Sequence, residues 1–316
     1  MNISTKLLKA AAGSAGGAGL DVDEVFSTFV ADATGSGSLT INNGIDLSGE
    51  GGIVWVKSRN NAHNHYIFDT NVGSGGYLIP NSSTVGLTGA NYSFTSTGLT
   101  DAYNNYSGNE AVWWTFRKAP KFFDVVTYTG NGANRTIAHS LDSVPGMIII
   151  KRLDNNNPWC IFHRSTGNTG FINFDTNGFS TVSNFMNNTS PTSTNFALGT
   201  RDDVNNSGNT YVAYLFAHND GDGEFGPDGD QDIISCGSVN ANSTFTLPWQ
   251  PQWILSKDYN RSGDWHIIDS MRGFTATGNA DNYLEANNAN AEQTAGWFNI
   301  DGNTLKNRSL RYYHLC

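Results

Sequence analysis

The sequence predicts an all-β protein, because its composition suits strands and turns and because one strand pattern occurs about three times along the chain. The 316 residues include 35 glycines and 12% aromatic residues, with many Asn, Ser and Thr. β-Branched and aromatic side chains fill a pleated surface, while Gly and Asn accept the positive φ of tight turns. Few segments have helical periodicity. The predicted fold class is therefore all-β, with tandem antiparallel β-sandwich domains of jelly-roll or lectin-like type and an extended N-terminal arm.

The clearest part of the repeat is a pair of short apolar runs separated by a polar turn, the pattern of a hairpin with a longer loop. The first run ends on a lysine in every copy, at Lys57, Lys151 and Lys257. The second run ends on an acid in the first and third copies. The paired runs are residues 53–57 with 66–69, 147–151 with 159–163, and 253–257 with 265–269.

An opening strand precedes each hairpin, and a closing strand follows it. The turn Asn-x-Ser-Gly-Asn stands before the closing strand at residues 105–109 and again at 205–209, in register, so chance explains it poorly. The third copy matches only loosely after residue 300, and its closing strand is expected within 312–316. The predicted parts are an N-terminal anchoring arm (1–20), β-sandwich repeat 1 (21–120), β-sandwich repeat 2 (121–220), and an acidic linker with a divergent β repeat 3 (221–316).

Charge, cysteines and hydropathy argue against several classes of protein. A net charge of −10 disfavours a nucleic-acid surface, where basic residues must neutralise phosphates. No apolar run approaches the roughly 18 residues of a membrane span. Three scattered cysteines without a C-x-x-C pair imply neither a disulfide framework nor a zinc site. The N-terminal segment favours a short helix over residues 7–12 and a flexible arm over a signal peptide, because Lys9 interrupts the apolar stretch.

Candidate catalytic residues are few. Asp69 and Asp269 share a register, and paired carboxylates are what a glycosidase uses, with the two acids held about 5–10 Å apart in one cleft. His163 replaces the acid in the second copy, so a structural hydrogen-bonding role at the strand end is favoured. His63 and His65 are interpreted as part of a polar turn, because a metal site needs further converging ligands. The sequence therefore predicts no catalytic residue and no enzyme.

The sharpest polar cluster is the segment 220–232, in which acids alternate with glycines. Such a segment can place oxygen ligands around a hard cation, so Ca²⁺ is a candidate cofactor. The EF-hand pattern fits only in part, because Phe225 stands at the glycine position and Gln231 at the bidentate acid. A solvated interdomain turn is the alternative. The candidate calcium ligands are Asp220, Asp222, Glu224, Asp228, Asp230 and Asp232.

Three segments carry a resemblance to a known family: residues 16–28 (GGAGLDVDEVFST), 43–52 (NGIDLSGEGG) and 114–126 (WTFRKAPKFFDVV). They resemble virion and tail-fibre structural proteins with repeated β domains from marine bacteriophages, including cyanophages. The resemblance spans nearly the whole chain, but the ending after residue 300 departs from the usual repeat. It implies a tail or tail-fibre component with lectin-like β domains.

We therefore expect a non-enzymatic virion protein, assembled in the host cytoplasm and attached to other virion proteins through residues 1–20. A homo-oligomer is expected, and neither nucleic-acid binding nor membrane insertion is. Tyr103, Tyr106 and Tyr259 stand on Asn/Gly-rich loops and are candidate contacts to a host-surface glycan, with partly buried loop aromatics as the alternative. Two other functions stay open: a capsid decoration or head-fibre protein, and a polysaccharide depolymerase.

Overall fold

The computed structural model describes residues 19–32, 39–73, 75–101, 109–175, 179–259, 263–274, 281–296, 298–307 and 313–315. Within these ranges the regular secondary structure is almost entirely β-strand, and the prediction of an all-β, antiparallel fold is confirmed. The predicted helix at residues 7–12 and all but the last two residues of the arm lie outside the described residues. None of the described helices is long and apolar enough to span a membrane. The helices are α2 (Val22–Val25), α3 (Leu47–Glu50) and α4 (Asp202–Asn205).

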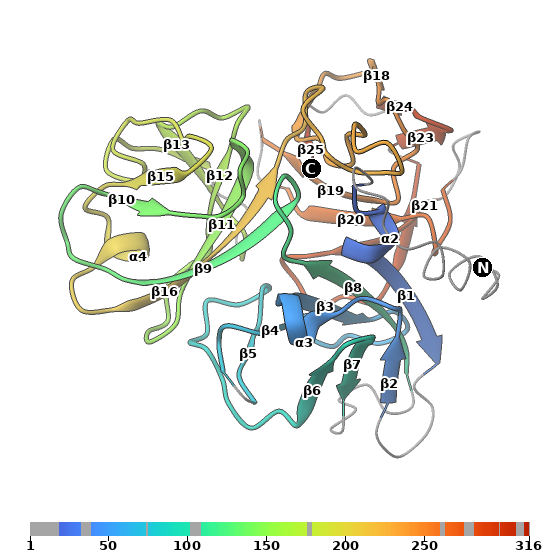
Figure 1. Cartoon of the computed structure of the whole chain (residues 1–316), viewed down its shortest axis with the longest axis horizontal. Helices are drawn as coiled ribbons and strands as arrows, with labels where there is room; N and C mark the ends of the chain where they lie inside the picture. Colours follow the sequence, from blue (N-terminus) through green and yellow to red (C-terminus); the bar gives the residue numbers. More distant parts are fainter. Residues whose placement is uncertain are drawn as a thin grey trace.

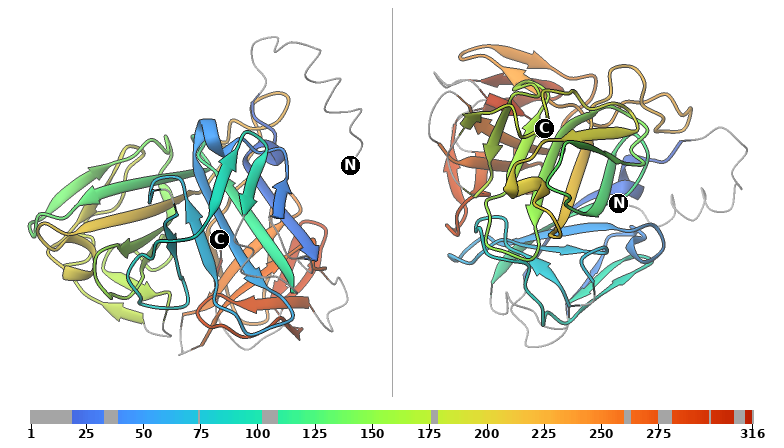
Figure 2. Two further views of the ribbon diagram at one scale, coloured as in Figure 1. Left: turned by 90° about the horizontal axis from the view of Figure 1, so that it is seen from below. Right: turned by 90° about the vertical axis from the view of Figure 1, so that its left-hand side faces the viewer.

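The strands form three groups, each with one large and one small antiparallel sheet (Figures 1 and 2). Repeat 1 contains β1 (Phe26–Asp32), β2 (Leu39–Asn42), β3 (Gly52–Ser58), β4 (Tyr66–Asp69), β5 (Tyr77–Leu78), β6 (Tyr92–Thr95), β7 (Gly98–Asp101) and β8 (Glu110–Arg117). Repeat 2 contains β9 (Phe123–Thr129), β10 (Arg135–Ala138), β11 (Pro145–Arg152), β12 (Cys160–His163), β13 (Gly170–Asn173), β14 (Phe179–Thr181), β15 (Asn195–Leu198) and β16 (Thr210–Ala217). Repeat 3 contains β17 (Gly237–Val239), β18 (Thr244–Thr246), β19 (Trp253–Asp258), β20 (Trp265–Asp269), β21 (Asp281–Glu285), β22 (Gln293–Ala295), β23 (Phe298–Asp301), β24 (Thr304–Asn307) and β25 (Tyr313–Leu315).

The three large sheets have the same strand order. The closing strand lies between the opening and central strands: β8 between β1 and β3, β16 between β9 and β11, and β25 between β17 and β19. The rest of the hairpin and a third strand follow on the other side of the central strand. The loosely matching end of repeat 3 thus does supply a closing strand, although β25 spans only three residues. Whether each repeat folds as a separate domain, with the limits given above, stays a prediction.

Each large sheet of repeats 1 and 3 is covered on both faces, because successive side chains of a strand point to opposite sides. In β3, Val54 and Val56 pack in a cluster with the small sheet of the same repeat. Ile53 and Trp55, on the other face, join a core that the three repeats share. Two buried faces explain why the central strands are continuous apolar runs rather than alternating ones.

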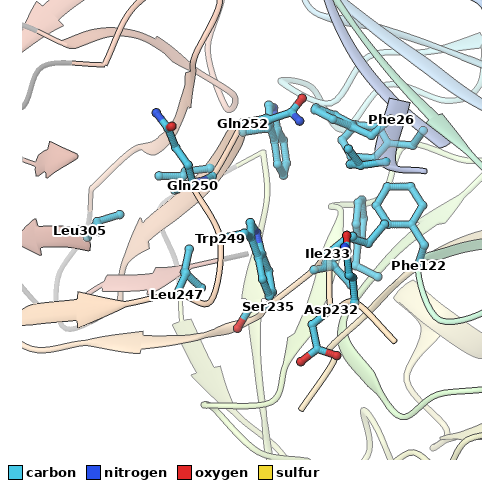
Figure 3. Close-up of a pocket in the computed structure, with 18 of the residues that line it drawn as sticks. Phe26, Phe122, Asp232, Ile233, Ser235, Leu247, Trp249, Gln250, Gln252 and Leu305 are labelled. Carbon is cyan, nitrogen blue, oxygen red and sulfur yellow. The ribbon is translucent and has the colours of Figure 1, made fainter. Parts of the chain in front are cut away.

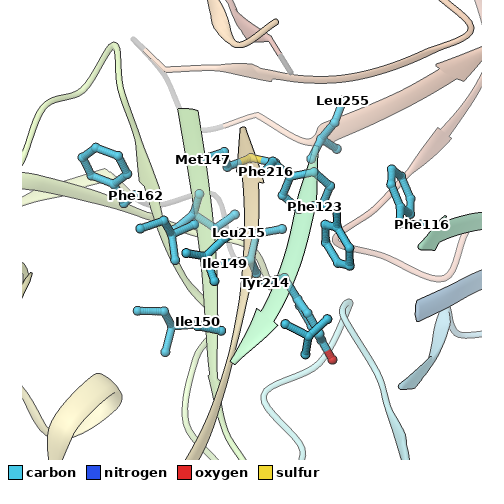
Figure 4. Close-up of a cluster of buried hydrophobic side chains, with 14 of the residues drawn as sticks. Phe116, Phe123, Met147, Ile149, Ile150, Phe162, Tyr214, Leu215, Phe216 and Leu255 are labelled. Carbon is cyan, nitrogen blue, oxygen red and sulfur yellow. The ribbon is translucent and has the colours of Figure 1, made fainter. Parts of the chain in front are cut away.

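The shared core is rich in aromatic rings from different repeats (Figure 4). The ring of Phe116 lies 5.6 Å from that of Phe123 and 5.5 Å from that of Phe216, between centroids. Trp253 of repeat 3 contacts Phe116 at 5.2 Å, edge to face. Because one core holds side chains from all three repeats, none of them has its inner sheet face covered without the others.

Polar ring atoms also connect the repeats, at one equivalent place in each. A ring nitrogen near the start of the second hairpin strand bonds to a backbone carbonyl at the end of the third strand of another repeat. The bonds join His65 Nε2 to Glu285 O (3.0 Å), Trp159 Nε1 to Ile79 O (3.2 Å) and Trp265 Nε1 to Asn173 O (3.1 Å). Repeat 1 thus bonds to repeat 3, repeat 2 to repeat 1, and repeat 3 to repeat 2. These ring–carbonyl bonds close a cycle.

His65 corrects the interpretation of the histidines as a polar turn. His63 is exposed, but His65 is completely buried. Its Nδ1 accepts a hydrogen bond from Trp55 Nε1 at 2.9 Å, so the proton is on Nε2, which donates to the Glu285 carbonyl. Burial holds the pKa of His65 well below its usual value. His65 is therefore a neutral ring of the junction, in the position that Trp159 and Trp265 occupy elsewhere.

The three lysines of the repeat are buried as well. Each extends to the loop that follows its central strand, where its ammonium group donates to backbone carbonyls. Burial lowers the pKa of Lys57 and of Lys151 to about 8. The acceptors are Ser58 O and Asn61 O for Lys57, Ser83 O and Asn157 O for Lys151, and Asp258 O and Gly263 O for Lys257.

We predict that Trp159→Phe lowers the free energy of unfolding by about 1–3 kcal/mol, because the Ile79 and Ser82 carbonyls lose their buried donor. The matched control is Trp253→Phe, since Trp253 Nε1 has no hydrogen-bond partner among the described residues. Urea unfolding of both variants measures the difference. Equal destabilisation by the two substitutions would show that the ring–carbonyl bond contributes nothing.

Candidate functional site

A cavity of about 390 Å³ lies where the three repeats meet (Figure 3). This volume falls within the range of about 300–1,000 Å³ that is usual for ligand pockets. One wall is formed by aromatic side chains of strand residues. It consists of Phe26 and Phe116 from repeat 1, Phe216 from repeat 2 and Trp253 from repeat 3. Because these rings belong to the shared core, the wall is preformed.

The other walls come from two loops, residues 231–235 and 247–252. Trp249 is half-buried against the cavity, while Gln250 is exposed beside it. Asp232 lines the opposite side, as Figure 3 shows. Its carboxylate accepts the backbone N–H groups of Gly221 and Gly223, both at 2.8 Å, which fixes this loop.

The described charged residues that line the cavity are acidic. Asp21, Asp23 and Asp232 are among its lining residues, and no lysine or arginine is among the described ones. An apolar aromatic wall with an acidic margin is suited to an apolar or aromatic group that carries positive charge next to it.

A hydrolytic arrangement is not formed at the serine that lines this cavity. Ser235 Oγ lies 3.5 Å from His218 Nδ1. The same nitrogen accepts the backbone N–H of Cys236 at 3.0 Å, so its lone pair is already used. A histidine in this state cannot take the proton of a serine, as a general base must.

Asp69 and Asp269 are buried hydrogen-bond acceptors at junctions between repeats. Asp69 accepts from the hydroxyl of Tyr214 in repeat 2 at 2.8 Å. Asp269 accepts from Trp114 Nε1 of repeat 1 at 3.0 Å and from Arg272 Nε at 2.6 Å. Burial raises the pKa of Asp69 to about 6. Neither acid lines the cavity.

The acidic segment 220–232 is fully described, and its carboxylates mostly face solvent. Glu224 pairs with Lys121 Nζ at 3.1 Å, and Asp232 binds backbone N–H groups. Among the described residues of the chain, no group of three or more His, Cys, Asp or Glu side chains is placed to hold a metal ion. Calcium binding stays a prediction.

Of the three tyrosines predicted to contact a glycan, the structure describes one. Tyr103 and Tyr106 lie outside the described residues, and Tyr259 is half-buried immediately after β19. Of the predicted site residues that the structure describes, only Asp232 lines the cavity. Trp249 and Trp253, on either side of Pro251, are the sequence signal that could have indicated the cavity.

Among the cysteines, Cys160 is buried and free, whereas Cys236 is disulfide-bonded, a pairing that the sequence did not imply.

A family model described as a domain of unknown function (DUF7483) matches residues 24–313. The chain belongs to this family. The match runs from α2 to the first residue of β25, so the family unit comprises all three repeats and the junction between them. A search of curated proteins found no match.

We predict that Asp69→Asn changes how stability depends on pH. In the native protein the pKa of Asp69 is about 6, above its value in the unfolded chain, so the folded state binds the extra proton between about pH 4 and 6. Its contribution to stability is therefore present below pH 4 and falls as the pH rises through 6. The cost of the substitution should be up to about 3 kcal/mol smaller at pH 7 than at pH 4.

Urea unfolding at pH 4 and pH 7 measures this difference, with the exposed Asp301→Asn as control. A cost of Asp69→Asn that is the same at both pH values would contradict the buried, proton-binding acid.

Proposed function

We propose that this chain is a non-enzymatic structural protein of a bacteriophage particle, a component of the tail or tail fibre that displays its loops towards the host surface. The observation that carries the proposal is the cycle of ring–carbonyl bonds around one shared core. It joins three sandwich-like repeats through buried contacts into one unit. A rigid strand scaffold that holds long polar loops suits a particle component whose surface must recognise a partner.

The use of the acids supports a role without catalysis. Asp69 and Asp269 are the two acids of the repeat that could have served as the catalytic pair of a glycan-cleaving enzyme. Both are instead buried acceptors of inter-repeat hydrogen bonds. The assignment to a phage particle rests on the resemblance of residues 16–28, 43–52 and 114–126 to marine phage tail proteins.

Attachment through residues 1–20 is supported by the contacts of the last two residues of the arm. Leu20 forms a parallel bridge with Phe225, and its carbonyl accepts the Gly226 N–H at 2.9 Å. Gly19 lies so close to this segment that a Cβ atom on it would be 2.0 Å from Glu224 O. The last two residues of the arm are therefore held at a fixed point on the body, as an anchoring segment requires.

The test is a deletion of residues 1–18, which keeps Gly19 and Leu20 and so leaves the described contacts intact. We expect particles assembled with the shortened chain to lack this protein, because its attachment is lost. Immunoblotting of purified particles measures the incorporation. A melting temperature equal to that of the full chain is the control for folding, and normal incorporation of the folded, shortened chain would contradict the anchoring role.

A further inference from the structure

A second pocket, of about 280 Å³, lies between repeats 1 and 2 at the outer edge of β9. β9 ends its six-stranded sheet, with β16 on its inner edge. The described lining comes from Asn71 and Lys118 of repeat 1, from residues 124–127, and from residues 138–140 at the end of β10. We call this site the edge pocket.

The hydrogen bonds around β9 show which of its backbone groups face the edge pocket. Ala217 N–H donates to Phe122 O at 2.9 Å, and Gly130 N–H donates to Asn209 O at 2.8 Å. The even-numbered residues of β9 are therefore the ones bonded to β16. Because backbone groups alternate between the two edges of a strand, the N–H and C=O groups of residues 125, 127 and 129 point outward.

Most of this outer edge is already occupied by side chains of the same chain. Val125 O accepts from Asn71 Nδ2 at 3.2 Å and from Lys118 Nζ at 3.4 Å. Thr129 O accepts from Arg135 at 2.8 Å. Proteins commonly protect edge strands against pairing in this way. Thr127 between them is too short a stretch for an added strand, so the edge pocket suits a small group.

The polar groups of the edge pocket keep hydrogen-bonding capacity for such a group. Lys118 Nζ lies 3.1 Å from Asp124 Oδ1 and also donates to Val125 O, which leaves one of its three hydrogens. Asp124 Oδ2 accepts the Ser140 N–H at 2.7 Å and keeps a second lone pair. The side-chain hydroxyls of Thr127 and Ser140 are exposed and make no hydrogen bond within the described chain.

This arrangement selects the chemistry of the ligand. The charges of Lys118 and Asp124 cancel, so the pair favours neither an anion nor a cation. It offers a donor beside an acceptor, which matches neighbouring hydroxyl groups, because each hydroxyl both donates and accepts. His139 adds no charge, since its Nδ1 accepts the Leu141 N–H at 3.2 Å and its Nε2 donates to Thr192 O at 3.2 Å.

We propose that the edge pocket binds a neutral pyranose unit of a glycan, with two neighbouring hydroxyls on Lys118 and Asp124 and a third on Thr127. The proposal deepens the recognition role given above and rests on it only for the source of the glycan. Incorporation of the chain into particles tests that role separately, so the two proposals can fail independently.

The experiment uses the full chain and the methyl pyranosides of glucose, galactose, mannose and N-acetylglucosamine. Saturation-transfer NMR titrations measure their binding, with glycerol as the comparison. We expect at least one pyranoside to bind with a Kd of about 1–10 mM, because a single sugar unit makes few contacts. Glycerol should bind about tenfold more weakly, since it has neighbouring hydroxyls but no ring to reach Thr127 at the same time.

Variants of β9 locate the site. Thr127→Val keeps the branched shape that suits a strand and removes the hydroxyl, so it should weaken pyranoside binding about fivefold. The matched control is Thr129→Val, because Thr129 is the next outward residue of the same strand, is exposed, and does not line the edge pocket. It should bind as the native chain does.

Four results would overturn the proposal. One is no binding of any of the four pyranosides up to about 50 mM. The second is glycerol binding as tightly as the pyranosides, and the third is equal binding by Thr127→Val and Thr129→Val. The fourth comes from hydrogen exchange with a capped peptide of residues 210–216, the strand that pairs with β9: slower exchange of the Thr127 amide would make this edge a docking site for a strand instead.

Discussion

The hydrogen bond between a buried ring nitrogen and a backbone carbonyl of another repeat is the constraint on which the rest of the structure depends. A ring N–H that is removed from water without an acceptor is costly, roughly 1–3 kcal/mol in protein mutants. In this chain the acceptor belongs to a different repeat for His65, Trp159 and Trp265. Burying these rings is therefore favourable only when the neighbouring repeat is in place, which couples the three repeats to each other.

The acids follow the same logic. Asp69 and Asp269 accept hydrogen bonds from polar aromatic residues of the next closing strand, Tyr214 and Trp114. Their shared register along the chain reflects a shared position in the junction. A pattern that first suggests a pair of catalytic carboxylates is thus accounted for by the packing of one repeat on another.

The sequence predicted local structure well, because hairpins are encoded by neighbouring residues. The apolar runs at 53–57, 147–151 and 253–257 are the central strands, and the second runs pair with them as predicted. The junction could not be predicted. His65 stands in an Asn-rich turn whose neighbours give no sign of burial, and its partner carbonyl is 220 positions away. The cavity was missed for a similar reason, since its walls come from all three repeats and become adjacent only on folding.

The buried lysines have a consequence for how the surface can vary. Lys57, Lys151 and Lys257 hold the loops after the central strands through backbone carbonyls, a group that every amino acid supplies. Side chains in these loops can therefore be exchanged without loss of the attachment. Mutation can therefore alter the surface of the loops while their main-chain path and the fold are preserved.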